Sequence, residues 1–350
     1  MDLQCICAAK ISFDPCLSSM SGLGIHHTSN KKEPLPQEAY YIKQCLQEEA
    51  LRLGFVAMGI ARAEEVDEAA RLHHLSKRAR YGVGDMTYLE RNDHIRFDPR
   101  LLLPGAQSII MLAFNYYPAE KQSEEVPQIA CYAYGTDYHK VVKDKLYILV
   151  NFLKERISTP FKARVFVDSA PFMERYWAMK AGIGRIARNG LVLIPDHGSF
   201  CFLSEILLTL PLPYDSPLSG SPCGNCHRCM EACPMGAITE SDGIIPTKCI
   251  SYQTIESKSK LPSNFPTTGN RFIFGCDQCQ LVCPYNRKLT PHQEPQLSLR
   301  SSLLNLSKQD WLNLPEEVFE SLAHESPLKR AGIERIRYCI RHLSDEEKRK

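Results

Sequence analysis

Apolar and polar residues recur along this chain with two periods, one that fits helices and one that fits strands. From Gln37 onward the apolar positions, among them Ile42 and Leu46, keep helical spacing until Gly54 ends the segment. The run FVAMGIA at 55–61 carries no polar side chain, which is typical of a buried strand. The chain therefore opens with a helix that leads into a strand.

The same two patterns alternate as far as residue 210. Segment 137–157 is a long amphipathic pattern, and 171–182 begins with a proline and ends with a glycine, as many helices do. Short apolar runs of strand-like composition separate these helical segments. Because helices and strands alternate, the first half of the chain is predicted to have an α/β (α+β) fold. The expected strands are 108–114, 163–168, 191–194 and 199–210.

Shifts in composition divide the chain into four parts. Residues 1–36 have mixed polarity and end in a lysine- and proline-containing stretch, so we expect a poorly ordered leader. The α/β domain is expected over 37–212, where a proline-rich stretch ends it. Most cysteines fall within 213–292, the expected second domain. Residues 293–350 form the C-terminal segment, whose pattern indicates two helices and which is basic from Ser326 onward.

Charge and hydropathy give no sign of a membrane or of a strongly basic protein. Lysine and arginine together number 42 and acidic residues 40, for a formal net charge of +2. No stretch has the eighteen consecutive apolar residues of a membrane span, and the N-terminus lacks the charge and apolar pattern of a secretory signal. We therefore expect a soluble, cytoplasmic protein.

The cysteine pattern carries the most specific chemistry in the chain. Cys223, Cys226, Cys229 and Cys233 follow the spacing C-x2-C-x2-C-x3-C and precede Pro234, which is the run of bacterial two-cluster ferredoxins. In that arrangement three thiolates bind one 4Fe–4S cluster and the fourth reaches the neighbouring cluster. The first run therefore predicts a second set of ligands.

The second set is present in a modified form. Cys276, Cys279 and Cys283 keep the close spacing, and Pro284 follows, but the remaining cysteine, Cys249, lies 27 residues before Cys276. A pair of zinc knuckles is the alternative, since Cys-x2-Cys pairs also bind zinc. We assign Cys223, Cys226, Cys229 and Cys283 to one 4Fe–4S cluster, and Cys233, Cys249, Cys276 and Cys279 to the other.

Two clusters form an electron conduit, and the α/β part must supply its endpoint. The sequence Gly182-Ile183-Gly184 follows a helix and lacks the third glycine of a dinucleotide-binding fingerprint, so nicotinamide binding is not indicated. A flavin or an organometallic cofactor stays open on the residues alone.

Several motifs, taken in order, resemble those of the epoxyqueuosine reductase family. They are IRFDPRLLLPGAQSII, GTDYHKVV, the stretch VFVDSAPFMERYWAMKAGIGRIARNGLVLIPDHGSFCFLSEILL, the cysteine runs and CISYQTIE, and they span about 38–340. The resemblance implies a cobalamin-binding α/β domain related to that of reductive dehalogenases, followed by a ferredoxin-like domain. It implies an oxidoreductase acting on CH or CH2 groups, which converts epoxyqueuosine to queuosine at the wobble position of tRNA.

The resemblance also implies roles for individual residues. Asp168 would donate a proton to the opening epoxide; its place at a strand end suits a functional group, and burial beside a cofactor would favour its protonated form. The alternative for Asp168 is an N-cap of the following helix. The other expected contacts of cobalamin, held as cob(II)alamin, are Arg96, Cys131, Val192, Leu203, Ser251 and Asp277. Without the resemblance, each of these residues has an ordinary structural alternative. Arg96 could form a surface ion pair, Cys131 could belong to the core, Val192 and Leu203 could be plain strand residues, and Ser251 and Asp277 could make loop hydrogen bonds.

The expected partners follow from the implied reaction. They are tRNA that carries epoxyqueuosine and an electron donor such as flavodoxin or ferredoxin, and the protein is expected to be a monomer. Two alternatives stay open, a reductive dehalogenase-like enzyme and a non-enzymatic electron-transfer protein. Candidate phosphate-binding residues are Lys77, Arg78, Arg80, Arg287, Lys288 and the C-terminal basic cluster that includes Arg335 and Arg337.

Overall fold

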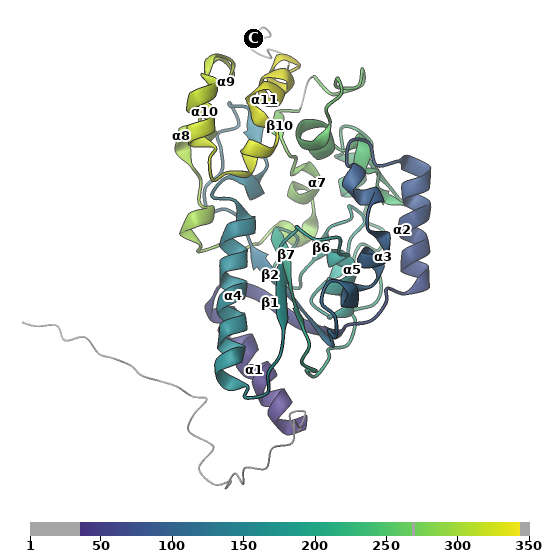
Figure 1. Ribbon diagram of the computed structural model, residues 1–350. Helices are drawn as coiled ribbons and strands as arrows, with labels where there is room; N and C mark the ends of the chain where they lie inside the picture. Colours follow the sequence, from purple (N-terminus) through teal and green to yellow (C-terminus); the bar gives the residue numbers. More distant parts are fainter. Residues whose placement is uncertain (1–35, 268–269, 344–350) are drawn as a thin grey trace, which may run out of the picture.

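A four-stranded antiparallel sheet forms the centre of the computed structural model, which describes residues 36–267 and 270–343 (Figure 1). Nearly all of the expected leader therefore lies outside the described residues. The strand order is β1-β2-β7-β4, and each neighbouring pair is antiparallel. The strands are β1 (Phe55–Arg62), β2 (Ser108–Asn115), β7 (Cys201–Leu208) and β4 (Ala163–Phe166).

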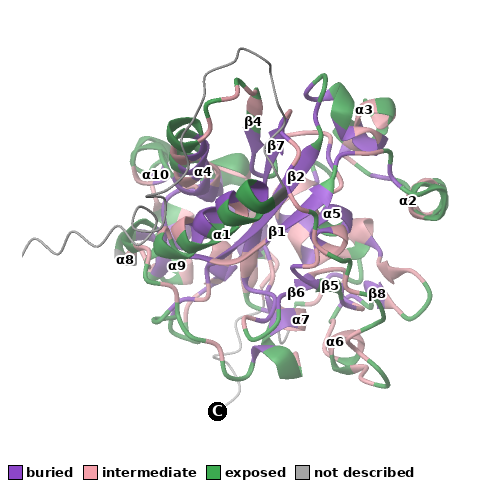
Figure 2. Ribbon diagram, turned by 90° about the horizontal axis from the view of Figure 1, so that it is seen from below, coloured by how far each residue is buried: buried purple, intermediate pink, exposed green. Residues whose placement is uncertain are grey.

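Helices cover both faces of this sheet, as Figure 2 shows from below. One face packs against α1 (Pro36–Arg52) and α4 (Tyr138–Arg156), and the other against α5 (Glu174–Lys180). Two further helices, α2 (Glu68–Tyr81) and α3 (Asp93–Phe97), lie on the α5 side (Figures 1 and 2). Side chains alternate along β2, so that Ile110 belongs to the core under α4 and Met111 to the core under α5.

The cysteine-rich segment is built from short elements. The helices α6 (Arg228–Glu231) and α7 (Gln278–Leu281) pack against each other, and β8 (Ile238–Thr239) pairs with β9 (Gly243–Ile244). The strand β10 (Phe272–Phe274) runs parallel to β3 (Gln128–Ile129), which belongs to the α/β part. A π-helical turn, η5 (Tyr252–Glu256), follows Cys249. The remaining pair, β5 (Arg185–Ile186) and β6 (Val192–Leu193), is antiparallel.

The C-terminal segment contains more helices than the sequence predicts. After α8 (Ser301–Leu304), the described residues form α9 (Lys308–Asn313), α10 (Glu316–Leu322) and α11 (Gly332–Arg341). The prediction of two helices was wrong because Pro315 separates α9 from α10, where the pattern reads as one helix. Trp311, Phe319 and Ile336 are fully buried in the same hydrophobic core as the residues under α4.

Short 3-10 turns connect these elements. The turns are η1 (Thr87–Glu90), η2 (Pro99–Leu101), η3 (Cys131–Ala133), η4 (Pro246–Lys248), η6 (Pro284–Asn286), η7 (Pro295–Leu297) and η8 (Pro327–Arg330).

Among the described residues, no helix is both long enough and apolar enough to span a bilayer.

Candidate active site

Asp168 lies just beyond the end of β4 with its side chain exposed to solvent. Its φ angle of 46° falls in the left-handed region, which few residues other than glycine, asparagine and aspartate adopt. Tyr138, the first residue of α4, donates a hydrogen bond of 2.7 Å from Oη to Asp168 Oδ2. The Tyr138 ring stacks on Phe202 at a centroid distance of 4.1 Å. A rigid aromatic pair therefore fixes the direction of an exposed carboxyl group.

The N-cap alternative for Asp168 is wrong, because helix α5 begins at Glu174 with Met173 at its N-cap. Asp168 is exposed to solvent in the structure, and its expected burial beside a cofactor stays a prediction.

Two further carboxyl groups lie near Asp168 in the interior. Glu205 of β7 is fully buried, and neither carboxyl oxygen has a hydrogen-bond partner among the described residues. Burial raises the pKa of Glu205 well above its ordinary value, and the carboxyl groups of Glu174 and Asp168 add to the rise. Burial likewise raises the pKa of Glu174 to about 8. Burial therefore favours the protonated form of both groups.

Leu203 and Glu205 point to the same face of β7 because side chains alternate along a strand. Leu203 is half-buried there, whereas Val192 is buried at the start of β6. Both pack in the hydrophobic core on the α5 side of the sheet. The structure therefore places these two predicted cofactor contacts on the same side of the sheet as Glu205.

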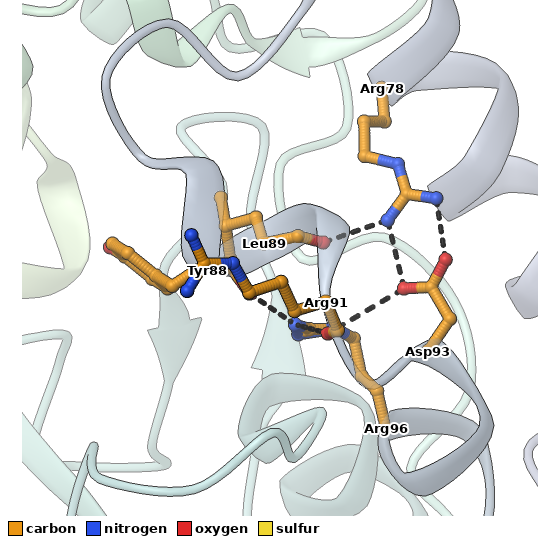
Figure 3. Close-up of polar contacts among 6 residues, drawn as sticks. All are labelled: Arg78, Tyr88, Leu89, Arg91, Asp93 and Arg96. Carbon is orange, nitrogen blue, oxygen red and sulfur yellow. Dashed lines mark hydrogen bonds and ion pairs between the residues drawn. The ribbon is translucent and has the colours of Figure 1, made fainter.

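Arg96 is buried, with 4% of its surface exposed, and it serves the turn that carries Tyr88 (Figure 3). Its Nη2 donates to the carbonyl oxygens of Tyr88 and Arg91 at 3.3 and 3.2 Å. Arg78 donates to the carbonyl of Leu89 at 2.7 Å, and its guanidinium also pairs with Asp93. The two arginines thus hold η1 in place from α2 and α3.

This turn presents Tyr88 at the exposed side of the site. Burial raises the pKa of Tyr88, and the carboxylates of Glu256 and Asp168 add to that rise. Arg330, on η8, forms an ion pair of 2.7 Å with Glu256 and also interacts with Tyr88. An aromatic ring and a guanidinium group therefore lie near Asp168, and they come from opposite ends of the chain.

The first four-cysteine set is brought together by the fold. Burial raises the pKa of Cys229, and the thiols of Cys223, Cys283 and Cys226 add to the rise because they are close. The backbone N–H of Arg188 donates to Cys223 Sγ at 3.3 Å, and the Arg188 guanidinium bonds the carbonyl of Cys226. Arg188, from the loop between β5 and β6, thus attaches this set to the α/β part.

The second set is also grouped as predicted. Burial raises the pKa of Cys276 well above its ordinary value, and Cys249 and Cys279 add to the rise. Cys233 acts in the same way on Cys249. Burial raises the pKa of Cys279 to about 12, with a contribution from Cys229 of the first set. The two sets are therefore neighbours, and the role of each cysteine as an iron ligand stays a prediction.

Within the described residues, no three His, Cys, Asp or Glu side chains are close enough to share a single metal ion. A 4Fe–4S cluster does not require such convergence, since each of its four thiolates binds a different iron atom. The spacing of the two sets is therefore compatible with the predicted clusters.

Three predicted cofactor contacts lie beside the second set. Asp277 is buried, and its Oδ2 accepts a hydrogen bond of 2.7 Å from the backbone N–H of Cys131. Burial raises the pKa of Asp277, and the hydrogen bond from Cys131 opposes the rise. Burial also raises the pKa of Cys249, and hydrogen bonds from Ser251 oppose this rise. These polar groups already have partners within the protein, as in the loop-residue alternative.

Comparison with known proteins adds independent evidence. The family model described as "Epoxyqueuosine reductase QueG, DUF1730" matches residues 96–169, and the model described as "4Fe-4S double cluster binding domain" matches 222–286. An epoxyqueuosine reductase from Cellulophaga algicola is 42% identical over 294 residues, which cover 83% of this chain and 95% of the relative. An epoxyqueuosine reductase from Pseudomonas aeruginosa is 36% identical over 308 residues, which cover 86% of this chain and 84% of the relative.

The chain belongs to the epoxyqueuosine reductase family. A solved structure of an epoxyqueuosine reductase with a tRNA-Tyr epoxyqueuosine-modified stem loop superposes with a TM-score of 0.77 at 27% identity, covering 87% of this chain and 81% of that one. A structure of the Bacillus subtilis enzyme matches equally well, at 26% identity. The family resemblance, the oxidoreductase class and the α/β fold followed by a two-cluster domain are thereby confirmed. The limits of the domains stay a prediction.

Sequence reasoning assigned no role to three residues that the structure places near Asp168. Tyr138 was quoted only within a helix and the motif GTDYHKVV, and Glu174 and Glu205 were not singled out. A glutamate within the apolar run SFCFLSEILL was the available signal, because a charged residue in a central strand is rarely buried without a function.

The predicted tRNA-binding residues of this family member fall into two groups. Several are engaged within the fold: Arg78 with Asp93, Arg80 with Asp242, and Arg335 with the carbonyl oxygens of Gln253 and Ser259. Arg337 bonds the carbonyl of Leu314. Arg287 and Lys288 are exposed, and they are among the candidates still open to an outside partner.

Proposed function

We propose that this protein reduces epoxyqueuosine to queuosine at the wobble position of tRNA, the last step of queuosine biosynthesis. Family membership across both the α/β part and the cluster domain carries this proposal. The solved relative bound to an epoxyqueuosine-modified stem loop supports tRNA as the substrate. We also propose that the protein acts in the cytoplasm as a monomer.

Residues on the α5 side of the sheet fit the predicted cobalamin cofactor. Half-buried Leu203, which packs in the same core as buried Val192, would offer apolar surface, and the peripheral amide groups of cobalamin could donate hydrogen bonds to a carboxyl group. Glu205 has no partner within the described chain, so such a donor would satisfy it. When bound as cob(II)alamin and reduced, the cofactor supplies a metal-centred route for electrons to the epoxide carbon.

Asp168 acts as the general acid in this proposal. Removing the epoxide oxygen consumes two electrons and two protons and releases one water molecule. A substrate that covers the end of β4 excludes water from Asp168 and so favours its protonated form. Tyr138 keeps the carboxyl group aimed at the substrate, because its hydroxyl is already bonded to Oδ2 at 2.7 Å. Asp168 then gives one of the two protons to the leaving oxygen.

The two cysteine sets would hold the predicted 4Fe–4S clusters, which would supply electrons one at a time. The thiol of Cys229 in the first set adds to the raised pKa of Cys279 in the second, so the two cysteine sets lie close together. The N–H of Cys131 bonds Asp277, which is adjacent to Cys276, and this contact joins the second set to the α/β part. The external reductant is proposed to be a flavodoxin or a ferredoxin.

Analysis of tRNA from a strain that lacks this gene tests the function. We expect epoxyqueuosine to accumulate, and queuosine to return when the wild-type gene is supplied but not with Asp168→Asn. Normal queuosine in the deletion strain would refute the proposal. Rescue by Asp168→Asn would instead favour a protein that only transfers electrons. Dehalogenation of organohalides without any effect on tRNA would favour the dehalogenase alternative.

A further inference from the structure

An open groove lies between the two short helices of the cysteine-rich segment. Its volume is about 520 Å³, and its walls come from α6 and from the end of α7 with the turn that follows. Glu231 and Leu281 occupy equivalent positions in the two cysteine runs, as do Ala232 and Val282, so both runs contribute to this surface. The lining residues are Arg228, Glu231, Ala232, Leu281, Val282 and Arg287.

The groove lies immediately beside the predicted cluster ligands. Arg228 directly precedes Cys229, Ala232 precedes Cys233, and Val282 precedes Cys283. Cys229 and Cys283 belong to the first set, whose thiols are close to one another. A molecule seated in the groove is therefore one residue away from the ligands of the first set.

The groove combines apolar area with unpaired positive charge. Leu281 exposes 45% of its surface, and the neighbouring Tyr285 exposes 55%, although both are large and apolar. Within the described part of the chain, neither Arg228 nor Arg287 has an ion-pair partner, whereas nearby Arg188 is bound to Glu240 and to backbone carbonyls. Exposed apolar residues ringed by arginine are typical of protein–protein interfaces.

We infer that this groove is the docking surface for a small acidic protein that carries single electrons. Acidic groups on the carrier would pair with Arg228 and Arg287, and its apolar surface would cover Leu281 and Tyr285. In each encounter the carrier loses one electron and the first cluster gains one. Two encounters supply the two electrons that the reaction consumes. This inference rests on the proposed function, because only a reductive reaction needs such a carrier.

The groove suits a protein better than it suits tRNA. Phosphate binding favours a row of lysine and arginine without acidic neighbours, but Glu231 and the exposed Leu281 line the groove together with these two arginines. The proposed proton donor that the wobble base must reach, Asp168, lies just beyond β4 in the α/β part and not in the cysteine-rich segment. Lower affinity for tRNA is therefore the competing outcome of the test.

The test uses the loaded enzyme with both clusters and cobalamin, and an acidic flavodoxin as the donor. The variant Arg228→Glu/Arg287→Glu reverses both charges of the groove. The matched control, Lys154→Glu/Lys162→Glu, makes the same change at exposed positions beyond the groove, at the end of α4 and before β4. Four quantities are measured: flavodoxin-driven turnover, dithionite-driven turnover, flavodoxin affinity and affinity for epoxyqueuosine tRNA.

We expect the groove variant to lose at least about tenfold in flavodoxin-driven kcat/KM at low salt, with the loss shrinking as salt rises. Flavodoxin affinity should fall in parallel, while dithionite-driven turnover and tRNA affinity stay at wild-type values. The control should match the wild type in all four.

Two results would overturn the inference. One is flavodoxin-driven turnover that is unchanged in the groove variant or equally reduced in the control. The other is a loss of tRNA affinity with normal flavodoxin affinity, which would assign the groove to tRNA. Failure of the wild-type enzyme to act on epoxyqueuosine tRNA even with dithionite would instead reject the proposed function itself.

Discussion

Asp168 holds a backbone conformation that limits what can replace it. At a φ of 46°, asparagine is tolerated whereas alanine and larger residues are strained. Asparagine also keeps an oxygen that can accept the Tyr138 hydrogen bond, but it has no acidic proton. Asp168→Asn therefore removes the proposed chemistry and leaves the local structure intact.

We expect Asp168→Asn to lower turnover on epoxyqueuosine tRNA by about 10²- to 10⁴-fold, the usual contribution of a general acid. Its melting temperature should stay within a few degrees of the wild type. Asp168→Ala is the comparison, because it should lose both activity and about 1 kcal/mol of stability through strain at this φ. Turnover of Asp168→Asn above a tenth of the wild type would contradict the assignment.

Glu205 gives the protein a pH-dependent stability. Its pKa in the folded protein lies well above the ordinary value of 4.5, because burial disfavours the anion. At pH values above 4.5, Glu205 has lost its proton in the unfolded state but keeps it in the folded state. Stability therefore falls as pH rises, until Glu205 also ionises in the folded protein. Glutamine at this position does not titrate, so Glu205→Gln should flatten the decline.

Melting temperatures measured from pH 5 to pH 8 test this expectation. The wild type should lose more stability over that range than Glu205→Gln does. Glu231→Gln, at an exposed position, should keep the wild-type slope. Equal slopes for the wild type and Glu205→Gln would show that Glu205 does not hold its proton in the folded protein.

At the residue scale, the sequence predicted Asp168 but not the groups around it. Asp168 could be found because a strand ends there and a family motif surrounds it. Tyr138 and Glu205 are brought near it by pairing of β4 with β7 and by the packing of α4, and these contacts join residues far apart in the chain. Local pattern alone cannot reveal such neighbours.

Among the helices, α11 supports the segment that carries Cys249. Arg335 on this helix donates from Nε to the carbonyl of Gln253 at 3.1 Å and from Nη1 to that of Ser259 at 2.7 Å. Gln253 belongs to η5, which follows Cys249 closely. The positive charge that suggested tRNA binding therefore has a structural use inside the protein.

Arg335→Ala should lower stability by about 1–3 kcal/mol, because the carbonyl group of buried Gln253 loses a charged donor. It should also reduce iron retention, since η5 no longer has its support. Circular dichroism melting and iron analysis measure these effects. Arg341→Ala, an exposed position on the same helix, should change neither quantity. A drop in tRNA affinity alone, at normal stability, would restore the binding role of Arg335.

At the scale of elements, regular periodicity was informative and short elements were not. The long helix α4 lies within the predicted segment 137–157, and β2 extends the predicted strand 108–114 by one residue. Helix α5 begins three residues later than the predicted segment, at Glu174. The antiparallel order β1-β2-β7-β4 depends on long-range pairing and could not be read from any single segment.

At the scale of the whole molecule, substitution of Cys249, which lies 27 residues before Cys276, tests whether the two cysteine sets act together. Cys249→Ser should remove the second cluster and lower the iron content from about eight to about four atoms per chain. Activity should disappear even with dithionite, because the second set joins the first to the α/β part. Iron analysis and turnover measure the two effects.

Cys201→Ala is the matched control for Cys249→Ser, since Cys201 lies on β7 and outside both predicted sets. It should retain all of the iron. If Cys249→Ser also retained eight iron atoms, the assignment of Cys249 as a ligand would be wrong, and zinc in either set would contradict the cluster prediction.

The parallel pairing of β10 with β3, together with helices α9 to α11 in the core under α4, has a consequence for how the protein can be made. The cysteine-rich segment is flanked on both sides by chain that completes a single interior. Two polypeptides obtained by cutting between 212 and 213 would each leave half of that interior facing water. Such halves would have to be co-expressed to reassemble. The half with the cysteine-rich segment could not be replaced by a foreign ferredoxin as an independent module.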